Sequence, residues 1–199
     1  MSFKDVKNLI YSDYKRFAYD KKGSYLKLLL IHPILPVLLI YRLKPYFVNE
    51  FQIPIIKQLT VKLLNLLFIV YKNLAGIELQ WATVIGKGIY IPHSYGIVIN
   101  SKCEIGDYCT IHQGVTIGRG GRGENEGVPK IGSYVYIGAG AVILGKIVVG
   151  NNSVIGANAV VTKDVPDNAV VVGIPAKIIN YNGSSDFINI SDNENLLIN

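Results

Sequence analysis

The sequence predicts a mainly β fold, a parallel β-helix built from hexapeptide repeats and preceded by an α-helical segment. Thirteen aliphatic residues recur at six-residue intervals, in three phased blocks between Ile85 and Val161. Glycine directly follows the aliphatic residue in seven of these hexads. A period of six fits neither a helix nor an alternating strand. It fits a solenoid whose short flat faces each turn one side chain inward.

The aliphatic column is the expected core of the solenoid. Each fully buried aliphatic side chain contributes roughly 1.5–3 kcal/mol, so stacking the coils is the main driving force for folding. A second column, mostly small or aliphatic, follows four positions later and contains Cys103 and Cys109. We expect both cysteines to pack in the core rather than to form a disulfide or a metal site. A β-sandwich of short strands is the alternative, but it would show a period of two.

Residues 1–75 form the predicted helical segment. An amphipathic helix is expected over 2–22 and a second, more regular helix over 54–74. The apolar run 25–41 between them is interrupted by a lysine, two prolines and His32. A membrane span usually needs about 20 apolar residues, so we do not expect one here. We interpret His32 as a packed or interfacial histidine.

The front segment is also the basic part of the chain. Residues 1–75 hold 12 Lys and Arg against 4 Asp and Glu, a net charge of +8, which leaves −2 for the rest. One interpretation is a helical cap on the first coil that helps subunits to associate. The other is peripheral contact with an anionic membrane, and the two are compatible. No secretory signal is visible, so we expect the cytoplasm or the inner face of its membrane.

The solenoid domain is predicted to span 76–179, followed by a polar tail over 180–199 that we expect to be partly disordered. Residues 118–130 break the period with five glycines and two arginines. A solenoid can expel such an insertion as a loop without disturbing its stack. The composition would suit a phosphate, but no strand–GxxxxGK[ST]–helix pattern accompanies it.

Few groups in the coils can do chemistry. Only His93 and His112 are histidines there, and His93 lies at the two-residue slip between the registers of Ile97 and Ile99. An exposed imidazole at such a break could act as a general base near neutral pH. The alternative is an ordinary surface histidine.

Four features together resemble the serine O-acetyltransferase family of hexapeptide acyltransferases. They are the hexads, the segment IPHSYGIVI around His93, the glycine-rich loop running into VPKIG, and the ending VVGIPAKI. The resemblance is closer still to the capsular and exopolysaccharide branch, which includes colanic acid biosynthesis acetyltransferases, and covers about residues 76–179. It implies a left-handed β-helix, a homotrimer and acetyl-CoA as the donor, with no metal.

The resemblance also implies roles for individual residues. His93 matches the family's catalytic histidine, which takes the proton of an acceptor hydroxyl so that the oxygen attacks the acetyl thioester. His112 is a secondary catalytic candidate. The family binds the CoA arm in a groove between subunits. The matching positions here are Gly118, Arg119, Gly138, Ala139, Ala157, Pro175 and Lys177.

Two positions depart from the family. The Asp that precedes the catalytic histidine is replaced by Pro92, and a second histidine by Val128. Losing groups that grip a zwitterionic amino acid argues against serine. The expected function is therefore acetyl-CoA-dependent O-acetylation of a sugar hydroxyl in capsular or exopolysaccharide biosynthesis.

Three other functions remain open. The chain could be a serine O-acetyltransferase of cysteine biosynthesis, or a non-catalytic β-helix scaffold. A metal-dependent lyase of the carbonic anhydrase type would need three histidines, whereas the coils supply two. We expect no nucleic-acid partner.

Overall fold

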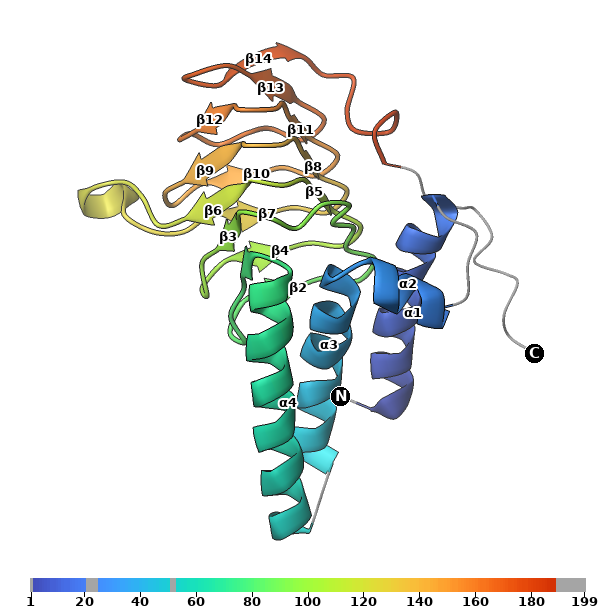
Figure 1. Cartoon of the computed structure of the whole chain (residues 1–199). Coiled ribbons are helices and arrows are strands. Elements are labelled where there is room, and N and C mark those ends of the chain that lie inside the picture. Colours follow the sequence, from blue (N-terminus) through green and yellow to red (C-terminus); the bar gives the residue numbers. More distant parts are fainter. Residues whose placement is uncertain (1, 21–24, 51–52, 189–199) are drawn as a thin grey trace.

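The computed structural model describes residues 2–20, 25–50 and 53–188. Its main body is a three-sided stack of coils, and four helices gather at the end where the coils begin (Figure 1). The strands are two to four residues long and lie in three sheets. The predicted hexapeptide β-helix with a helical front segment is confirmed.

Each coil contributes one strand to each face. The first sheet holds β1 (Ile77–Glu78), β3 (Ile97–Ile99), β6 (Thr116–Gly118), β9 (Val142–Leu144) and β12 (Val160–Val161). The second holds β2 (Val84–Ile85), β4 (Glu104–Ile105), β7 (Lys130–Ile131) and β10 (Val148–Val149). The third holds β5 (Thr110–Ile111), β8 (Tyr136–Ile137), β11 (Val154–Ile155), β13 (Val170–Val172) and β14 (Lys177–Asn180). All these pairings are parallel except that of β13 with β14.

The register places the predicted aliphatic residues directly on top of one another. Ile99 pairs with Ile117, which pairs with Ile143, and all three are buried. Cys103 and Cys109 are buried free thiols, as predicted. The glycines that follow the aliphatics allow the corners to stack closely. A Cβ on Gly106 would lie 2.6 Å from the carbonyl carbon of Gly132.

The helices are α1 (Phe3–Asp20), α2 (Tyr25–Ile31), α3 (Ile34–Glu50) and α4 (Pro54–Leu74). The predicted helices at either end of the front segment are present. Proline at position 33 divides the apolar run into α2 and α3, because proline removes a backbone donor and restricts the residue before it. Lys21 and Lys22, the last two residues of the predicted helix over 2–22, lie outside the described residues.

A buried polar cluster fixes the helices to the first two coils. The Arg42 Nε donates to Asp13 at 3.0 Å, and the Arg42 Nη1 donates to the Ile85 carbonyl at 2.6 Å. Asp13 in turn accepts from the backbone N–H of Ile89 at 3.1 Å. The Arg16 guanidinium donates to the Thr110 hydroxyl at 2.8 Å. The front segment therefore caps the open end of the solenoid, as one of the two interpretations expected.

One helix is also long and apolar enough to cross a membrane. Within the described residues only α4 passes this test of length and composition, with 11% of its apolar window buried. A helix that packs in a soluble protein can pass it too, so the test alone does not identify a span.

The last described residues pack against the solenoid. Residues 181–188 lie back along the outside of the solenoid, and Ser184 and Ile188 are buried there. The Ser184 hydroxyl donates to the backbone of an earlier coil, at the Tyr134 carbonyl. Residues 189–199 lie outside the described residues.

Candidate active site

His93 stands on the edge where the third sheet turns into the first, just before β3. Its neighbour Ser94 is buried, and the Ser94 hydroxyl donates to the Ala75 carbonyl at 2.6 Å. The Gly96 N–H donates to the Gly76 carbonyl at 2.8 Å. The segment around His93 is thus anchored to the end of α4, while the His93 side chain stays exposed. The register slip presents an imidazole outward on a fixed loop, as the sequence suggested.

His112 lies on the same edge, one coil further along. Its backbone N–H donates to the Ile137 carbonyl at 3.0 Å, and its ring lies 5.1 Å from the ring of Tyr136. Burial lowers the pKa of His112, and the positive charge of His93 lowers this pKa further. The two histidines are therefore close enough to interact, and His112 favours its neutral form.

A cavity of about 190 Å³ opens beside His93. The solenoid contributes one wall and the turn between α2 and α3 contributes the other; the lining residues are Ile31, His32, Pro33, Ile34, Pro92, His93, Ser94 and Tyr95. His32 packs edge-on against Phe17, with 5.5 Å between the ring centroids. The expectation of a packed histidine is correct, but His32 also faces the cavity. The six-residue period could not reveal this, because it carries no information about the front segment.

Three of the predicted CoA-binding residues lie on the histidine edge. Gly138 and Ala139 follow β8, and Ala157 follows β11. A Cβ on Gly138 would lie 2.6 Å from the backbone nitrogen of Ala157, so glycine is required for the coils to approach. The Gly138 N–H already donates to the Ile155 carbonyl at 2.8 Å. The Gly138 N–H is therefore used in the stacking of the coils.

The other four predicted CoA-binding residues lie elsewhere. Gly118 is the last residue of β6. It lies at the edge of the first sheet opposite the histidine edge, where the glycine-rich loop leaves the stack. Arg119 is exposed on that loop, and its Nη2 lies 2.6 Å from Glu126. Pro175 and Lys177 are exposed at the last coil, where the Ala176 N–H donates to the Val160 carbonyl at 2.8 Å. One chain alone therefore does not gather all of these positions into a single groove.

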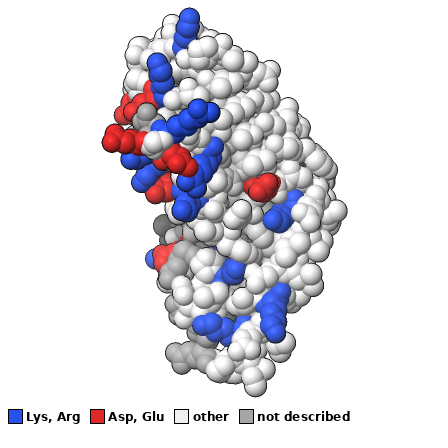
Figure 2. Space-filling view, turned by 90° about the vertical axis from the view of Figure 1, so that its left-hand side faces the viewer, with Lys and Arg blue, Asp and Glu red and all other residues white. Residues whose placement is uncertain are grey.

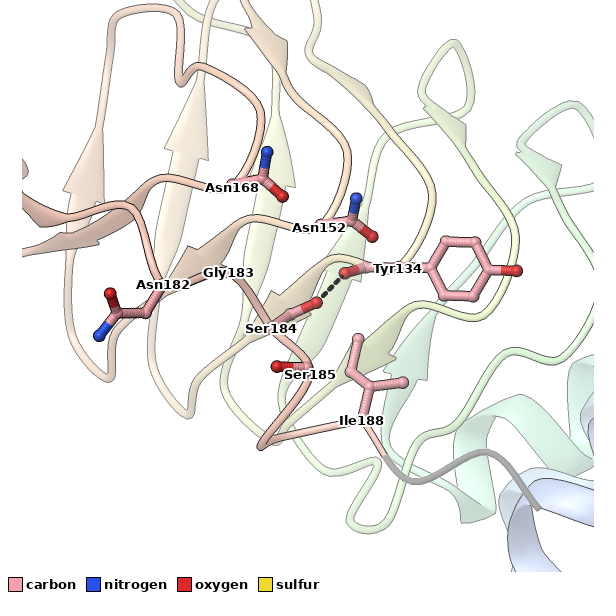
Figure 3. A pocket seen from close by; sticks show the side chains of 8 residues that line it. All are labelled: Tyr134, Asn152, Asn168, Asn182, Gly183, Ser184, Ser185 and Ile188. Atoms are coloured by element: carbon pink, nitrogen blue, oxygen red, sulfur yellow. Dashed lines mark hydrogen bonds between the residues drawn. The ribbon is translucent and has the colours of Figure 1, made fainter. Parts of the chain in front are cut away.

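A second cavity lies on a different edge, where the second sheet turns into the third (Figure 3). Its volume is about 370 Å³, and Tyr134, Asn152 and Asn168 line it from the coils. The returning C-terminal segment forms the other wall through residues 182–185 and 188. None of the predicted site residues lines this cavity. The C-terminal segment packs along this cavity. The Ser184 hydroxyl holds it there by donating to the Tyr134 carbonyl.

Known proteins share both the sequence pattern and the fold. The family model for bacterial transferase hexapeptide (six repeats) matches residues 129–163. A serine acetyltransferase of Synechococcus elongatus is 37% identical over 158 residues, which cover 79% of this chain and 62% of that protein. The crystal structure of a serine acetyltransferase from Brucella abortus has a TM-score of 0.71 at 30% identity, covering 90% of this chain and 71% of that one. The chain belongs to the serine acetyltransferase family. The left-handed β-helix with an N-terminal helical region is thereby confirmed.

Complexes in the same family are relevant to the site. The Brucella abortus enzyme has been solved with coenzyme A. A Neisseria gonorrhoeae serine acetyltransferase, 29% identical with a TM-score of 0.68, has been solved with serine; the match covers 90% of this chain and 71% of that one. The present chain spans less than two thirds of the length of the curated relatives, 62% for the Synechococcus protein.

These similarities correct the functional prediction. We expected a sugar hydroxyl as acceptor and a place in the capsular branch, because Pro92 and Val128 replace family residues. The strong matches in both sequence and structure are to serine acetyltransferases. The interpretation as a polysaccharide acetyltransferase is therefore wrong, and the alternative of a serine O-acetyltransferase is favoured. The comparisons give no support to membrane association.

Proposed function

We propose that this protein transfers an acetyl group from acetyl-CoA to the hydroxyl of serine, the reaction that leads into cysteine biosynthesis. The observation that carries the proposal is the exposed imidazole of His93 beside a small cavity, in a chain of the serine acetyltransferase family. Three copies would assemble side by side, as the family resemblance implies.

In the proposed mechanism, neutral His93 accepts the proton of the serine hydroxyl as its oxygen attacks the thioester carbonyl. The C–O bond forms, the C–S bond breaks, and His93 returns the proton to the departing thiolate of CoA. A positioned general base of this kind contributes about 10²–10⁴-fold in rate. His112 keeps its neutral form beside it, which limits the positive charge along the edge.

The cavity next to His93 is the proposed acceptor site. Its volume of about 190 Å³ suits one small molecule. Val128 packs against the hydrophobic core and Pro92 offers no charge, so neither replaces the family's polar group. The polar side chains that line the cavity together with His93 are His32, the exposed Tyr95 and Ser94, whose hydroxyl already donates to the Ala75 carbonyl. We propose that His32 binds the serine acceptor.

The proposed path for CoA follows the histidine edge. Gly138, Ala139 and Ala157 form a stretch of small residues there, which permits close approach of the pantetheine arm. Gly118, Arg119, Pro175 and Lys177 lie on other parts of the surface, and would reach the same CoA from a neighbouring copy. Lys177 is the proposed phosphate partner.

The test measures CoA release with purified protein, acetyl-CoA and L-serine. We expect turnover, and His93→Ala should lower kcat by roughly 10²-fold or more. His32→Gln should raise KM for serine more than it lowers kcat. Lys102→Ala, an exposed change on another corner, is the control and should leave both constants unchanged. No turnover of serine by the wild-type protein, or full activity of His93→Ala, would refute the proposal.

A further inference from the structure

The outer face of α4 carries a continuous row of exposed apolar side chains. Ile56, Leu59, Leu63, Leu66 and Val70 are between 44% and 64% exposed. Ile55, Ile69 and Leu74 flank the row and are also more than half exposed. The inner face of the same helix is already used, since Leu64 and Phe68 are buried against the rest of the protein. The helix therefore has two apolar faces, of which the protein covers one.

The spacing of the row is that of a coiled coil. Its members follow one another at intervals of three, four, three and four residues. This alternation of a and d positions keeps one seam facing a partner helix, whereas a helix that only covers a globular core shows a wider apolar stripe. The next d position is Asn73, where the apolar row ends.

The charges around the row do not oppose a second copy. Within α4 the charged residues are lysines only, and Lys57 and Lys72 lie off the seam. Lys62 borders the seam, but in a parallel pair its position faces that of Leu67, which is uncharged. Figure 2 views the side of the molecule that bears α4, and only scattered basic side chains interrupt its lower, helical part. Eight side chains about half exposed offer several hundred Å², the order of the about 800 Å² per partner that a stable interface buries.

The direction of the helix fits copies that stand side by side. In Figure 1, α4 runs on from the first coil roughly along the stacking direction of the solenoid. It lies on the side from which the glycine-rich loop projects. Copies related by rotation about an axis along that direction would bring their α4 helices together in parallel.

We propose that α4 pairs in parallel with α4 of a second copy of this chain, through the seam formed by Ile56, Leu59, Leu63, Leu66 and Val70. The inference rests on the proposed assembly of copies and not on acetyl transfer. A stalk of parallel helices would continue the assembly beyond the solenoid and fix the solenoids in register, so that each histidine edge meets the same part of its neighbour.

The test uses single cysteines and a short bis-maleimide cross-linker on the full chain. Burial raises the pKa of the native Cys103 and Cys109 thiols to about 11 and about 12, so both react slowly. Leu59→Cys and Val70→Cys place thiols on the seam, roughly 16 Å apart along the helix. Gln58→Cys is the matched control, exposed on the same helix but off the seam.

We expect both seam variants to form cross-linked pairs and Gln58→Cys to form few. In a parallel pair each cysteine lies opposite the same cysteine of the other copy. Each variant must therefore form cross-linked pairs without the other variant present. Cross-linking only when Leu59→Cys and Val70→Cys are mixed would show an antiparallel pair and overturn the proposal. Equal cross-linking of all three variants, or of none, would also overturn it. So would loss of cross-linking as the protein binds phosphatidylglycerol vesicles, which would identify a lipid surface as the occupant. Serine turnover can succeed or fail independently of these outcomes.

Discussion

The substitution Asp13→Ala tests whether the buried polar cluster holds the helical cap on the solenoid. Asp13 accepts from Arg42 at 3.0 Å and from the Ile89 N–H at 3.1 Å, and the side chains of both ion-pair partners are at most 4% exposed. Removing one partner of a buried ion pair costs about 3–5 kcal/mol, because the remaining charge stays buried without compensation. Since a domain is stable by only about 5–15 kcal/mol, the cap should loosen visibly.

Trp81 provides the assay for this loosening. It is the only tryptophan of the chain, and its ring stacks on Phe68 of α4 with 3.9 Å between the centroids. Its fluorescence during urea unfolding therefore reports the junction between cap and first coil. The matched control is Glu126→Gln, which breaks the exposed pair with Arg119 and should cost at most about 1 kcal/mol. If Asp13→Ala lowered the free energy of unfolding no more than the control does, the cluster would not be what fixes the cap.

Three further outcomes are expected. Gly138→Ala should lower the free energy of unfolding by about 1–3 kcal/mol in a thermal melt, since the added Cβ meets the backbone nitrogen of Ala157 and cannot be accommodated by a rotamer change. Ser94→Ala leaves the Ala75 carbonyl without its hydroxyl donor, so kcat should fall along with stability, and unchanged kcat would show that the loop holds His93 without it. His112→Asn should flatten the pH dependence of stability. The folded state disfavours its protonation, so the wild type loses stability as pH falls below about 6.5, its ordinary pKa.

The solenoid could be predicted almost completely from the sequence. Each inward aliphatic pairs with its counterpart in the next coil, as Ile111 does with Ile137, because a repeated inward position can be satisfied only by stacking. The position of His93 followed from the slip in the period, since a break in register forces the backbone out of the stack. The packing of the two cysteines followed from their place in the small column.

The front segment was predicted less well. The lengths of α1 and α4 followed from their patterns, but the apolar run did not reveal that α3 continues to Glu50. Nor did the pattern reveal the buried contacts of Asp13, Arg16 and Arg42, because charged residues in a helix are usually exposed. Each of these side chains is buried because its partner comes from another element.

The wrong prediction of a sugar acceptor has a related physical origin. A repeat specifies only what recurs in every coil, so it predicts the edge of small residues along which a long, extended donor can lie. The proposed acceptor cavity lies where the repeat meets the non-repeating turn between α2 and α3, and half of its lining residues come from that turn. Pro92 lines this cavity from the solenoid, whereas Val128 packs against the hydrophobic core and does not line it. His32 enters the cavity from the turn between α2 and α3. Replacement of two polar groups in the coils therefore does not by itself exclude an amino acid, because a polar group can be supplied from the cap.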